Sequence, residues 1–179
     1  MTSRQDLGTL IVTGASRGIG AAITMLAGGR GYAVAVNFAT SEAEAKKVVD
    51  EIVSAGGRAV AIQADVSREQ DIVRLFATAE RDLGPIKALV NNAAITGGFA
   101  RVEEVSSAAL ANVFAVNASG TILCSREAVR RMSTRRGGTG GAIVNISSIA
   151  ARTGSPGEWV HYAASKARLT ASPSAWHAK

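Results

Sequence analysis

The fold is decided by a short apolar run and the glycine-rich turn after it, Leu10-Ile11-Val12-Thr13-Gly14-Ala15-Ser16-Arg17-Gly18-Ile19-Gly20. The apolar run has the composition of a strand buried in a parallel sheet. A helical segment, residues 21–27, follows the turn directly. Glycines let the backbone turn tightly and approach an anion, and the helix offers free N–H groups and the positive end of its dipole. A turn placed between a strand and a helix therefore predicts a phosphate-binding site.

Strand and helix patterns alternate along the rest of the chain. Further strands are expected at residues 33–38, 59–64, 88–90 and 142–147. Helices are expected after the capping pairs Ser41–Glu44 and Ser67–Gln70, over residues 102–135 with a break near 117–120, and from His161 onward. This alternation predicts the α/β class, with a Rossmann-type doubly wound parallel sheet and helices on both faces. Because no internal repeat or linker is visible, residues 1–179 are expected to form a single nucleotide-binding domain.

The composition is that of an ordinary globular protein. Of 179 residues, 47% are hydrophobic and 19% charged, which excludes an intrinsically disordered chain. The single cysteine, Cys124, excludes an intramolecular disulfide and is expected to be a small buried hydrophobe. Residues 1–8 lack the apolar core of a signal peptide, and no run approaches the ~18 apolar residues of a membrane span. We therefore expect a cytoplasmic protein without a membrane segment.

The net charge of +6 raises the question of a nucleic-acid partner. Four arginines cluster in one region, Arg130, Arg131, Arg135 and Arg136. They lie at the expected end of a helix, where cations complement the helix dipole. With only 4% aromatic residues, a stacking platform for single strands is improbable. We expect neither a nucleic-acid partner nor a metal site.

Two further motifs complete a family pattern. Asn91-Asn92-Ala93-Ala94 follows the expected strand at 88–90, and Tyr162-x-x-x-Lys166 lies near the C-terminus. Together with the Gly-x-x-x-Gly-x-Gly turn, they resemble the short-chain dehydrogenase/reductase family over residues 7–167. The resemblance implies hydride transfer between NAD(P)(H) and a small alcohol or carbonyl substrate. It also implies a homo-dimer or homo-tetramer formed through the helices that flank Asn117 and Tyr162.

The choice of cofactor depends on the end of the second strand, where NAD enzymes place an acid. That position holds Asn37, and no acid follows until Glu42. Arg17 in the glycine turn is suited to a 2′-phosphate, so the sequence favours NADP over NAD. Asp65 resembles the family's adenine contact, with helix entry as its alternative role. The full set of cofactor contacts implied by the resemblance is Gly14, Ser16, Arg17, Gly18, Ile19, Gly20, Asn37, Asp65, Val66, Asn92, Ala93, Tyr162 and Lys166.

The catalytic group is centred on Tyr162 and Lys166, which lie one helical turn apart and share a face. An ammonium ~4 Å from a phenol, at an effective dielectric of ~20, contributes about 4 kcal/mol. This would lower the pKa of the phenol from about 10 toward the range useful for proton transfer. The resemblance assigns substrate binding to Ser148, with Ser147 a lesser candidate because the spacing to Tyr162 is one residue longer than in many members. It assigns to Asn117 a helix kink and a water linking Lys166 to solvent; a plain helix break is the alternative.

After Lys166 the chain departs from the family pattern. Members continue the helix, add two strands and carry a loop over the substrate, whereas residues 167–179 are atypical and Pro173 would break the helix. Codons can be chosen for this tail that, read in a shifted frame, encode an apolar-periodic helix. We therefore hypothesise a single-base deletion or sequencing error just after Lys166. The nucleotide sequence would test this hypothesis. The chain as written is expected to expose the fifth strand as a sheet edge and to turn over weakly. A truncated, non-catalytic nucleotide-binding fragment is therefore the alternative to an active enzyme. His161, beside Tyr162, is expected on the surface.

Overall fold

A computed structural model describes residues 6–167 of the chain. Its strands are β1 (Thr9–Val12), β2 (Ala33–Phe38), β3 (Arg58–Gln63), β4 (Ile86–Asn91) and β5 (Ala142–Asn145). Its α-helices are α1 (Gly18–Gly29), α2 (Glu42–Ser54), α3 (Glu69–Leu83), α4 (Ser107–Phe114), α5 (Thr121–Met132), α6 (Ala150–Thr153) and α7 (Val160–Ala167). Three short helical segments complete the set, η1 (Val102–Glu104), η2 (Ala115–Gly120) and η3 (Thr134–Arg136).

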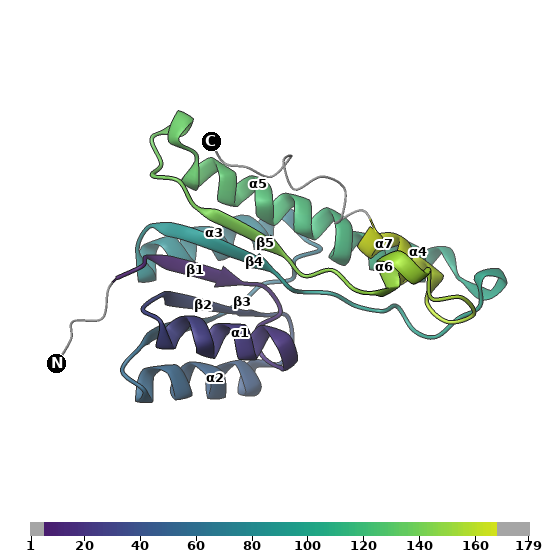
Figure 1. Ribbon diagram of the computed structural model, residues 1–179, viewed down its shortest axis with the longest axis horizontal. Helices are drawn as coiled ribbons and strands as arrows, with labels where there is room; N and C mark the ends of the chain where they lie inside the picture. The colour runs from purple at the N-terminus through teal and green to yellow at the C-terminus, as the bar shows by residue number, and fades with distance from the viewer. Residues whose placement is uncertain (1–5, 168–179) are drawn as a thin grey trace.

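The five strands form one parallel sheet in the order β3-β2-β1-β4-β5. β2 and β3 lie on one side of β1, and the chain then returns to place β4 and β5 on the other side. This reversal is the topological switch point at which open α/β sheets bind ligands, beyond the carboxyl ends of the strands. The prediction of a Rossmann-type parallel sheet is confirmed (Figure 1).

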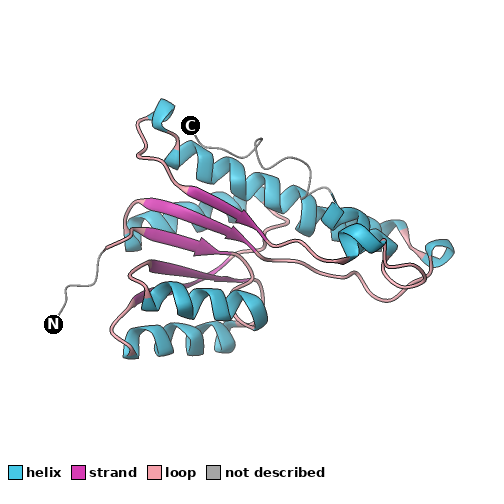
Figure 2. Ribbon diagram, in the orientation of Figure 1, coloured by secondary structure: helices cyan, strands magenta, loops and turns pink. Residues whose placement is uncertain are grey.

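Helices cover both faces of the sheet (Figure 2). Leu10 and Val12 of β1 pack toward α1 and α2, while Ile11 between them packs toward α3 and α5. This alternation, with apolar side chains on both faces, explains why the strands read as continuous apolar runs rather than alternating ones. Cys124 of α5 lies in the second of these layers, 1% exposed, and burial raises the pKa of its thiol to about 12. Its predicted role as a small buried hydrophobe is confirmed.

The long helix predicted over residues 102–135 differs from expectation in two places. It begins only at Ser107, after the short turn η1, and the predicted break near residues 117–120 is absent. In its place α4 and α5 join through the π-helical turn η2, which contains Asn117. The hydroxyl of Thr121 donates to the carbonyl oxygen of Asn117 at 2.9 Å, so side chains satisfy part of the backbone in this turn.

The combined helix, Ser107–Met132, is long and apolar enough to cross a membrane by length and composition, which a search for uninterrupted apolar runs does not reveal. It also carries buried polar side chains, among them Asn117, Ser125 and Glu127. Its α5 half packs on β4 and α3. These contacts are those of a helix covering a sheet.

Both predicted capping pairs are wrong in detail. Helix α2 does begin after Ser41, but that serine makes no side-chain cap hydrogen bond. Helix α3 begins at Glu69 after Arg68, one residue later than a Ser67 cap requires. The reason is local competition: Ser67 donates its backbone N–H and its hydroxyl to Asp65 Oδ1, at 2.9 and 2.7 Å.

Candidate dinucleotide-binding and catalytic site

The glycine turn after β1 presents an open helix N-terminus. Gly14 and Gly18 have φ values of 62° and 57°, a backbone conformation that side chains other than glycine rarely adopt. Helix α1 then starts with no side-chain cap and no acid in its first turn. Arg17, Gly18 and Ile19 are exposed there. These residues fit a phosphate group, because the free N–H groups and the guanidinium both favour an anion.

Gly20 lets this turn pack against the neighbouring strand end. A Cβ at this position would contact the carbonyl oxygen of Gly14 and lie 2.6 Å from Asn92 Nδ2. The Asn92 amide itself donates to the carbonyl oxygens of Thr13 and Gly14, both at 2.9 Å. Thr13 Oγ1 in turn accepts from the N–H groups of Asn92 and Ala93, at 3.0 and 3.1 Å. The predicted Asn-Asn-Ala-Ala motif therefore braces the glycine turn from β4.

A cleft of about 540 Å³ opens at the carboxyl ends of β1, β2 and β3. Nine of the predicted cofactor residues line it: Gly14, Ser16, Arg17, Ile19, Asn37, Asp65, Val66, Asn92 and Ala93. Gly18 and Gly20 belong to the adjoining turn but not to the lining, and the lining also excludes Tyr162 and Lys166. The structure thus brings together the residues predicted around the adenosine and pyrophosphate, while the predicted catalytic residues do not themselves line this cleft.

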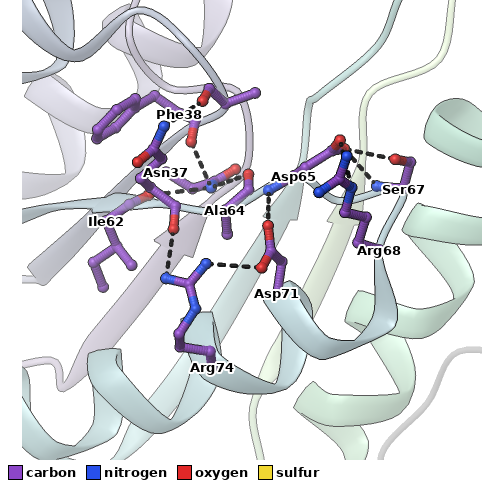
Figure 3. Close-up of polar contacts among 11 residues, drawn as sticks. Asn37, Phe38, Ile62, Ala64, Asp65, Ser67, Arg68, Asp71 and Arg74 are labelled. Atoms are coloured by element: carbon purple, nitrogen blue, oxygen red, sulfur yellow. Dashed lines mark hydrogen bonds and ion pairs between the residues drawn. The ribbon is translucent and has the colours of Figure 1, made fainter.

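Asn37 plays a different part from the one predicted. It is 1% exposed, and its Oδ1 accepts from the N–H of Gly14 at 3.2 Å. Its Nδ2 donates to the carbonyl oxygens of Ile62 and Ala64, at 3.2 and 3.0 Å (Figure 3). The side chain is therefore occupied by backbone groups and ties β2 to β3 and to the glycine turn. The position facing the cleft at the end of β2 shifts to Ala39, Thr40 and Ser41.

Asp65 combines its two proposed roles. Its Oδ1 accepts from Ser67, and its Oδ2 lies 3.7 Å from Arg68 Nε, so it organises the entry to α3. The same residue lines the cleft, where it is the only carboxylate among the described lining residues. Asp71 supports it by accepting from the N–H of Asp65 at 2.9 Å (Figure 3). This hydrogen bond, together with one from Arg74, lowers the pKa of Asp71.

Asn117 connects three parts of the predicted catalytic region. It is fully buried, and its Oδ1 accepts from the N–H of Ile95 at 2.9 Å. Its Nδ2 donates to the carbonyl oxygen of Ile95 and to Ser165 Oγ, both at 2.9 Å. The Ser165 hydroxyl then donates to the carbonyl oxygen of Tyr162 at 2.7 Å. Asn117 thus holds the loop after β4 against α7; the helix kink expected of it takes the form of the π turn.

Lys166 is buried beside the end of β5. It is 3% exposed, and its ammonium donates to the carbonyl oxygen of Ile146 at 2.8 Å. Desolvation by burial lowers the pKa of Lys166. The same ammonium lies 5.9 Å from the centre of the Tyr162 ring, so the two predicted partners do face one another from α7.

The two serines after β5 have different environments. Ser147 donates its hydroxyl to the carbonyl oxygen of Lys166 at 3.4 Å, which directs it toward α7. Ser148 Oγ accepts from the N–H of Ala150 at 3.2 Å, which leaves its hydroxyl hydrogen to donate. Within residues 6–167, no hydrogen bond joins the hydroxyls of Ser148 and Tyr162. Their catalytic roles stay predictions.

His161 is not on the surface. It is 3% exposed, and within the described part of the chain neither ring nitrogen has a hydrogen-bond partner. The loop after β4 covers it: a Cβ on Gly97 would lie 2.9 Å from His161 Nε2 and would also collide with Val113 of α4. The prediction was wrong because this loop packs over His161. The loop has no periodic sequence pattern, so its position could not be predicted from the sequence.

Sequence reasoning missed several residues of the cleft. Thr40, Ser41, Asn112 and Val116 line it without having been predicted. The first two follow β2 directly, so the rule that ligands bind beyond the carboxyl ends of strands would have found them. The last two lie on or next to α4, and only the tertiary fold brings them to the cleft.

The fold and the cleft define a class of protein: an α/β protein with a dinucleotide-type cleft at the switch point of a parallel sheet. A family model described as short chain dehydrogenase matches residues 8–176. The chain therefore belongs to the short-chain dehydrogenase family. The matched range extends into the tail at 167–179, most of which lies outside the described residues.

Particular relatives agree with this assignment. The chain is 46% identical over 159 residues to the uncharacterized oxidoreductase YgfF of Escherichia coli, covering 89% of this chain and 64% of the relative. It is 35% identical to a probable tetrahydroxynaphthalene reductase of Zymoseptoria tritici, covering 94% of this chain and 61% of the relative. A solved short-chain dehydrogenase/reductase of Serratia marcescens superposes with a TM-score of 0.85 at 33% identity, covering 93% of this chain and 65% of that one. The chain thus spans less than two thirds of the length of each.

Proposed function

We propose that this protein is an NADP(H)-dependent oxidoreductase that moves a hydride between the cofactor and a small alcohol or carbonyl compound. The observation that carries the cofactor assignment is the cleft. It combines an uncapped helix N-terminus, an exposed arginine and three hydroxyl residues, and its only described carboxylate is Asp65, which follows β3.

The chain's own residues divide the binding of NADP(H) between them. The N–H groups at the start of α1 would hold the pyrophosphate. Arg17, Thr40 and Ser41 would hold the 2′-phosphate, for which a guanidinium supplies two parallel hydrogen bonds. Asp65 and Val66 would border the adenine. No acid follows β2 until Glu42, so no carboxylate directly after β2 would repel the 2′-phosphate.

The chemistry at the substrate follows from Tyr162, Lys166, Ser148 and Asn117. The bound cofactor supplies the hydride, or accepts it in the reverse direction. Ser148 would donate a hydrogen bond to the substrate oxygen, and Tyr162 would give that oxygen a proton as the carbonyl is reduced, or take one back as the alcohol is oxidised. Lys166 faces Tyr162 from the same helix, and Asn117 holds the loop after β4 against that helix.

The cofactor assignment is tested by fluorescence titration of the 179-residue chain with NADPH and NADH. Wild-type protein is expected to bind NADPH more tightly. Arg17→Ala is expected to weaken NADPH binding by roughly 10- to 100-fold, the value of a charged hydrogen bond, and to change NADH binding little. Arg30→Ala is the matched control, because Arg30 is an exposed arginine at the other end of α1. Equal binding of the two cofactors, or a preference for NADH, would refute the assignment.

A second candidate is a cofactor-binding fragment without turnover. The cleft for the adenosine half is formed by residues 14–116, whereas Tyr162 and Lys166 lie on α7, which has eight described residues. Short helices depend on tertiary packing for their stability. Binding and turnover measured on one preparation, with panels of alcohols and ketones, separate the two. Binding without turnover would favour the fragment.

The remaining expectations are proposals of the same kind. We place the protein in the cytoplasm, acting on a small molecule as a homo-dimer or homo-tetramer, without a nucleic-acid partner. In support, Arg130 and Arg131 of the basic cluster pair with Glu127 at 2.8 and 2.7 Å rather than forming a free cationic surface.

A further inference from the structure

His161, near the start of α7, is buried without any hydrogen bond to its ring. It is 3% exposed, and within residues 6–167 neither ring nitrogen has a partner. Asn91 is the only other residue in that range with an unpartnered buried side-chain atom, and its amide still makes two hydrogen bonds. A polar group that leaves water normally gains a partner inside the protein. What covers the imidazole therefore decides whether it can stay buried.

The cover is the loop after β4, which runs beside α7 away from the sheet (Figure 1). Two hydrogen bonds with Asn117 anchor this loop at Ile95, and Ala100 anchors it again by donating its N–H to the segment before α7 at 3.0 Å. Between the two anchors, residues 96–99 make no hydrogen bond within the described part of the chain. All four are exposed. A single layer of weakly held backbone thus separates His161 from water.

Gly97 makes the closest contact between this loop and the ring. A Cβ there would lie 2.9 Å from His161 Nε2 and 3.1 Å from Cδ2, and it would collide with Val113 of α4. Gly97 and Gly98 have φ values of 80° and 91°, which glycine adopts readily. Two consecutive glycines also give the segment many other accessible conformations once it lifts. The loop therefore fits closely over a neutral imidazole but is not locked there.

No acid pairs with the imidazole from the elements around it. Helices α4 and η2, which contact α7, contain no titratable residue. The titratable residues of α6, α7, η1 and the adjoining loops are Tyr162, Lys166, Arg101, Arg152, Glu103, Glu104 and Glu158. All three of these acids are exposed, and Glu103 is paired with Arg101 at 3.1 Å. A charged imidazole would gain no counter-ion here, and it would share its helix with the buried ammonium of Lys166.

We propose that residues 96–99 form an acid-sensitive lid over His161, closed while the imidazole is neutral and open once it is charged. An unpaired cation is costly to bury, whereas an imidazole in water titrates near pH ~6.5. The closed lid thus binds fewer protons than the open lid, and acid favours opening. Only the segment between the two anchors has to move, so the sheet stays in place. This inference does not depend on the oxidoreductase assignment.

The test measures how fast a thiol beneath the lid is labelled by a dipyridyl disulfide reagent. Val113 is fully buried against Gly97, so Val113→Cys places a thiol where the reagent reaches it only when the lid lifts. The 179-residue chain has one other cysteine, Cys124, which lies in the core, and burial raises the pKa of its thiol to about 12. Labelling of Cys124 in the unsubstituted chain therefore measures wider unfolding.

The matched protein is Val113→Cys/His161→Phe, which keeps a flat ring that cannot take up a proton. Dividing the two labelling rates at each pH cancels the ionisation of the thiol itself. This ratio is expected to rise about tenfold between about pH 7.5 and about pH 5.5, because a histidine that titrates only in the open state favours opening by that factor. The corresponding ratio for Cys124, with and without His161→Phe, is expected to stay constant.

Two results overturn the proposal. One is a Val113→Cys ratio that does not change over this pH range. The other is an equal rise at Cys124, which would mean that acid unfolds the domain as a whole. Circular dichroism shows whether each variant is folded. His161→Gln replaces His161→Phe where the latter does not fold, because an amide is also neutral at both pH values.

The measurement is made without cofactor, so its outcome is separable from that of the cofactor assignment. A pH-dependent ratio in a chain that does not bind NADPH supports the lid and removes the proposed function. NADPH binding together with a constant ratio removes the lid and leaves the oxidoreductase proposal intact.

Discussion

Glu127 is a buried acid of α5, and arginines of the same helix surround its carboxylate. Its side chain is 4% exposed, with Arg131, Arg130 and Arg126 at 2.7, 2.8 and 3.2 Å. Arg126 and Arg131 continue to Glu69 and Glu80, both on α3. Burial alone would raise the pKa of Glu127, but the arginine hydrogen bonds and charges outweigh it and the pKa is lowered.

The sign of the pH dependence follows from that direction. A carboxyl whose pKa is lower in the folded state stabilises the fold above its unfolded pKa and loses this effect as the pH falls through the folded pKa. We predict that Glu127→Gln lowers the free energy of unfolding at pH 7 by ~3 kcal/mol, because three arginines lose their shared counter-charge. The deficit should begin to shrink as the pH falls through the ordinary glutamate pKa of about 4.3, and it should vanish only below the lowered pKa of folded Glu127.

Urea unfolding at several pH values measures this prediction. Glu51→Gln is the control, since Glu51 is an exposed acid of α2 and should change stability little at any pH. A Glu127→Gln variant as stable as wild type at pH 7 would show that the buried carboxylate contributes no net stability.

At the scale of single elements, helical glycines differ in whether close packing requires them. Gly120, at the junction of η2 and α5, faces β3 and its connection to α3: a Cβ there would lie 2.6 Å from the carbonyl oxygen of Val66. Gly29, at the end of α1, has open space where its Cβ would be. Both have helical backbone, so the same substitution tests contact alone.

We predict that Gly120→Ala lowers the free energy of unfolding by about 1–3 kcal/mol through overpacking. Gly29→Ala should leave it unchanged or raise it by up to ~1 kcal/mol, since alanine is the better helix former. Thermal and urea unfolding of the two variants give the comparison. A Gly120→Ala protein no less stable than Gly29→Ala would show that the backbone near Val66 yields readily.

The sequence predicted the elements well and their ends less well. All five strands were placed within about two residues, because apolar runs between helices carry a strong local signal. The cap at Ser67 failed because that serine is hydrogen-bonded to Asp65 instead. Ser41 also makes no side-chain cap hydrogen bond. Asn37 and His161 were misjudged for a related reason: their surroundings come from Ile62 and Gly97, which are distant in sequence. Local patterns do not encode such contacts.

At the scale of the whole molecule, β5 forms one border of the sheet. Among residues 6–167 it pairs only with β4, and Val144 at its centre is 50% exposed. An unpaired apolar strand edge is a template for pairing with another chain. The adjacent Ile143 packs into the core, so only one face of the strand is open to substitution.

We predict that Val144→Lys reduces self-association of the 179-residue chain without unfolding it, because a charge on an open edge strand opposes strand pairing. Light scattering and sedimentation against concentration provide the measurement. Val73→Lys is the control, since Val73 is an exposed apolar residue of α3, 41% exposed, away from any strand edge. Aggregation that responds equally to both substitutions would point to net charge rather than to β5.

The π turn at residues 115–120 also sets the angular relation between the two halves of the long helix. One extra residue in a turn rotates everything after it by roughly 100° relative to a regular helix. The half before the turn contacts α7, and the half after it contacts β4 and α3. Deleting a single residue from this turn would therefore swing Cys124, Ala128 and Met132 away from the sheet while leaving helical content nearly constant. A length change invisible to circular dichroism would thus separate the two contact faces of a single helix.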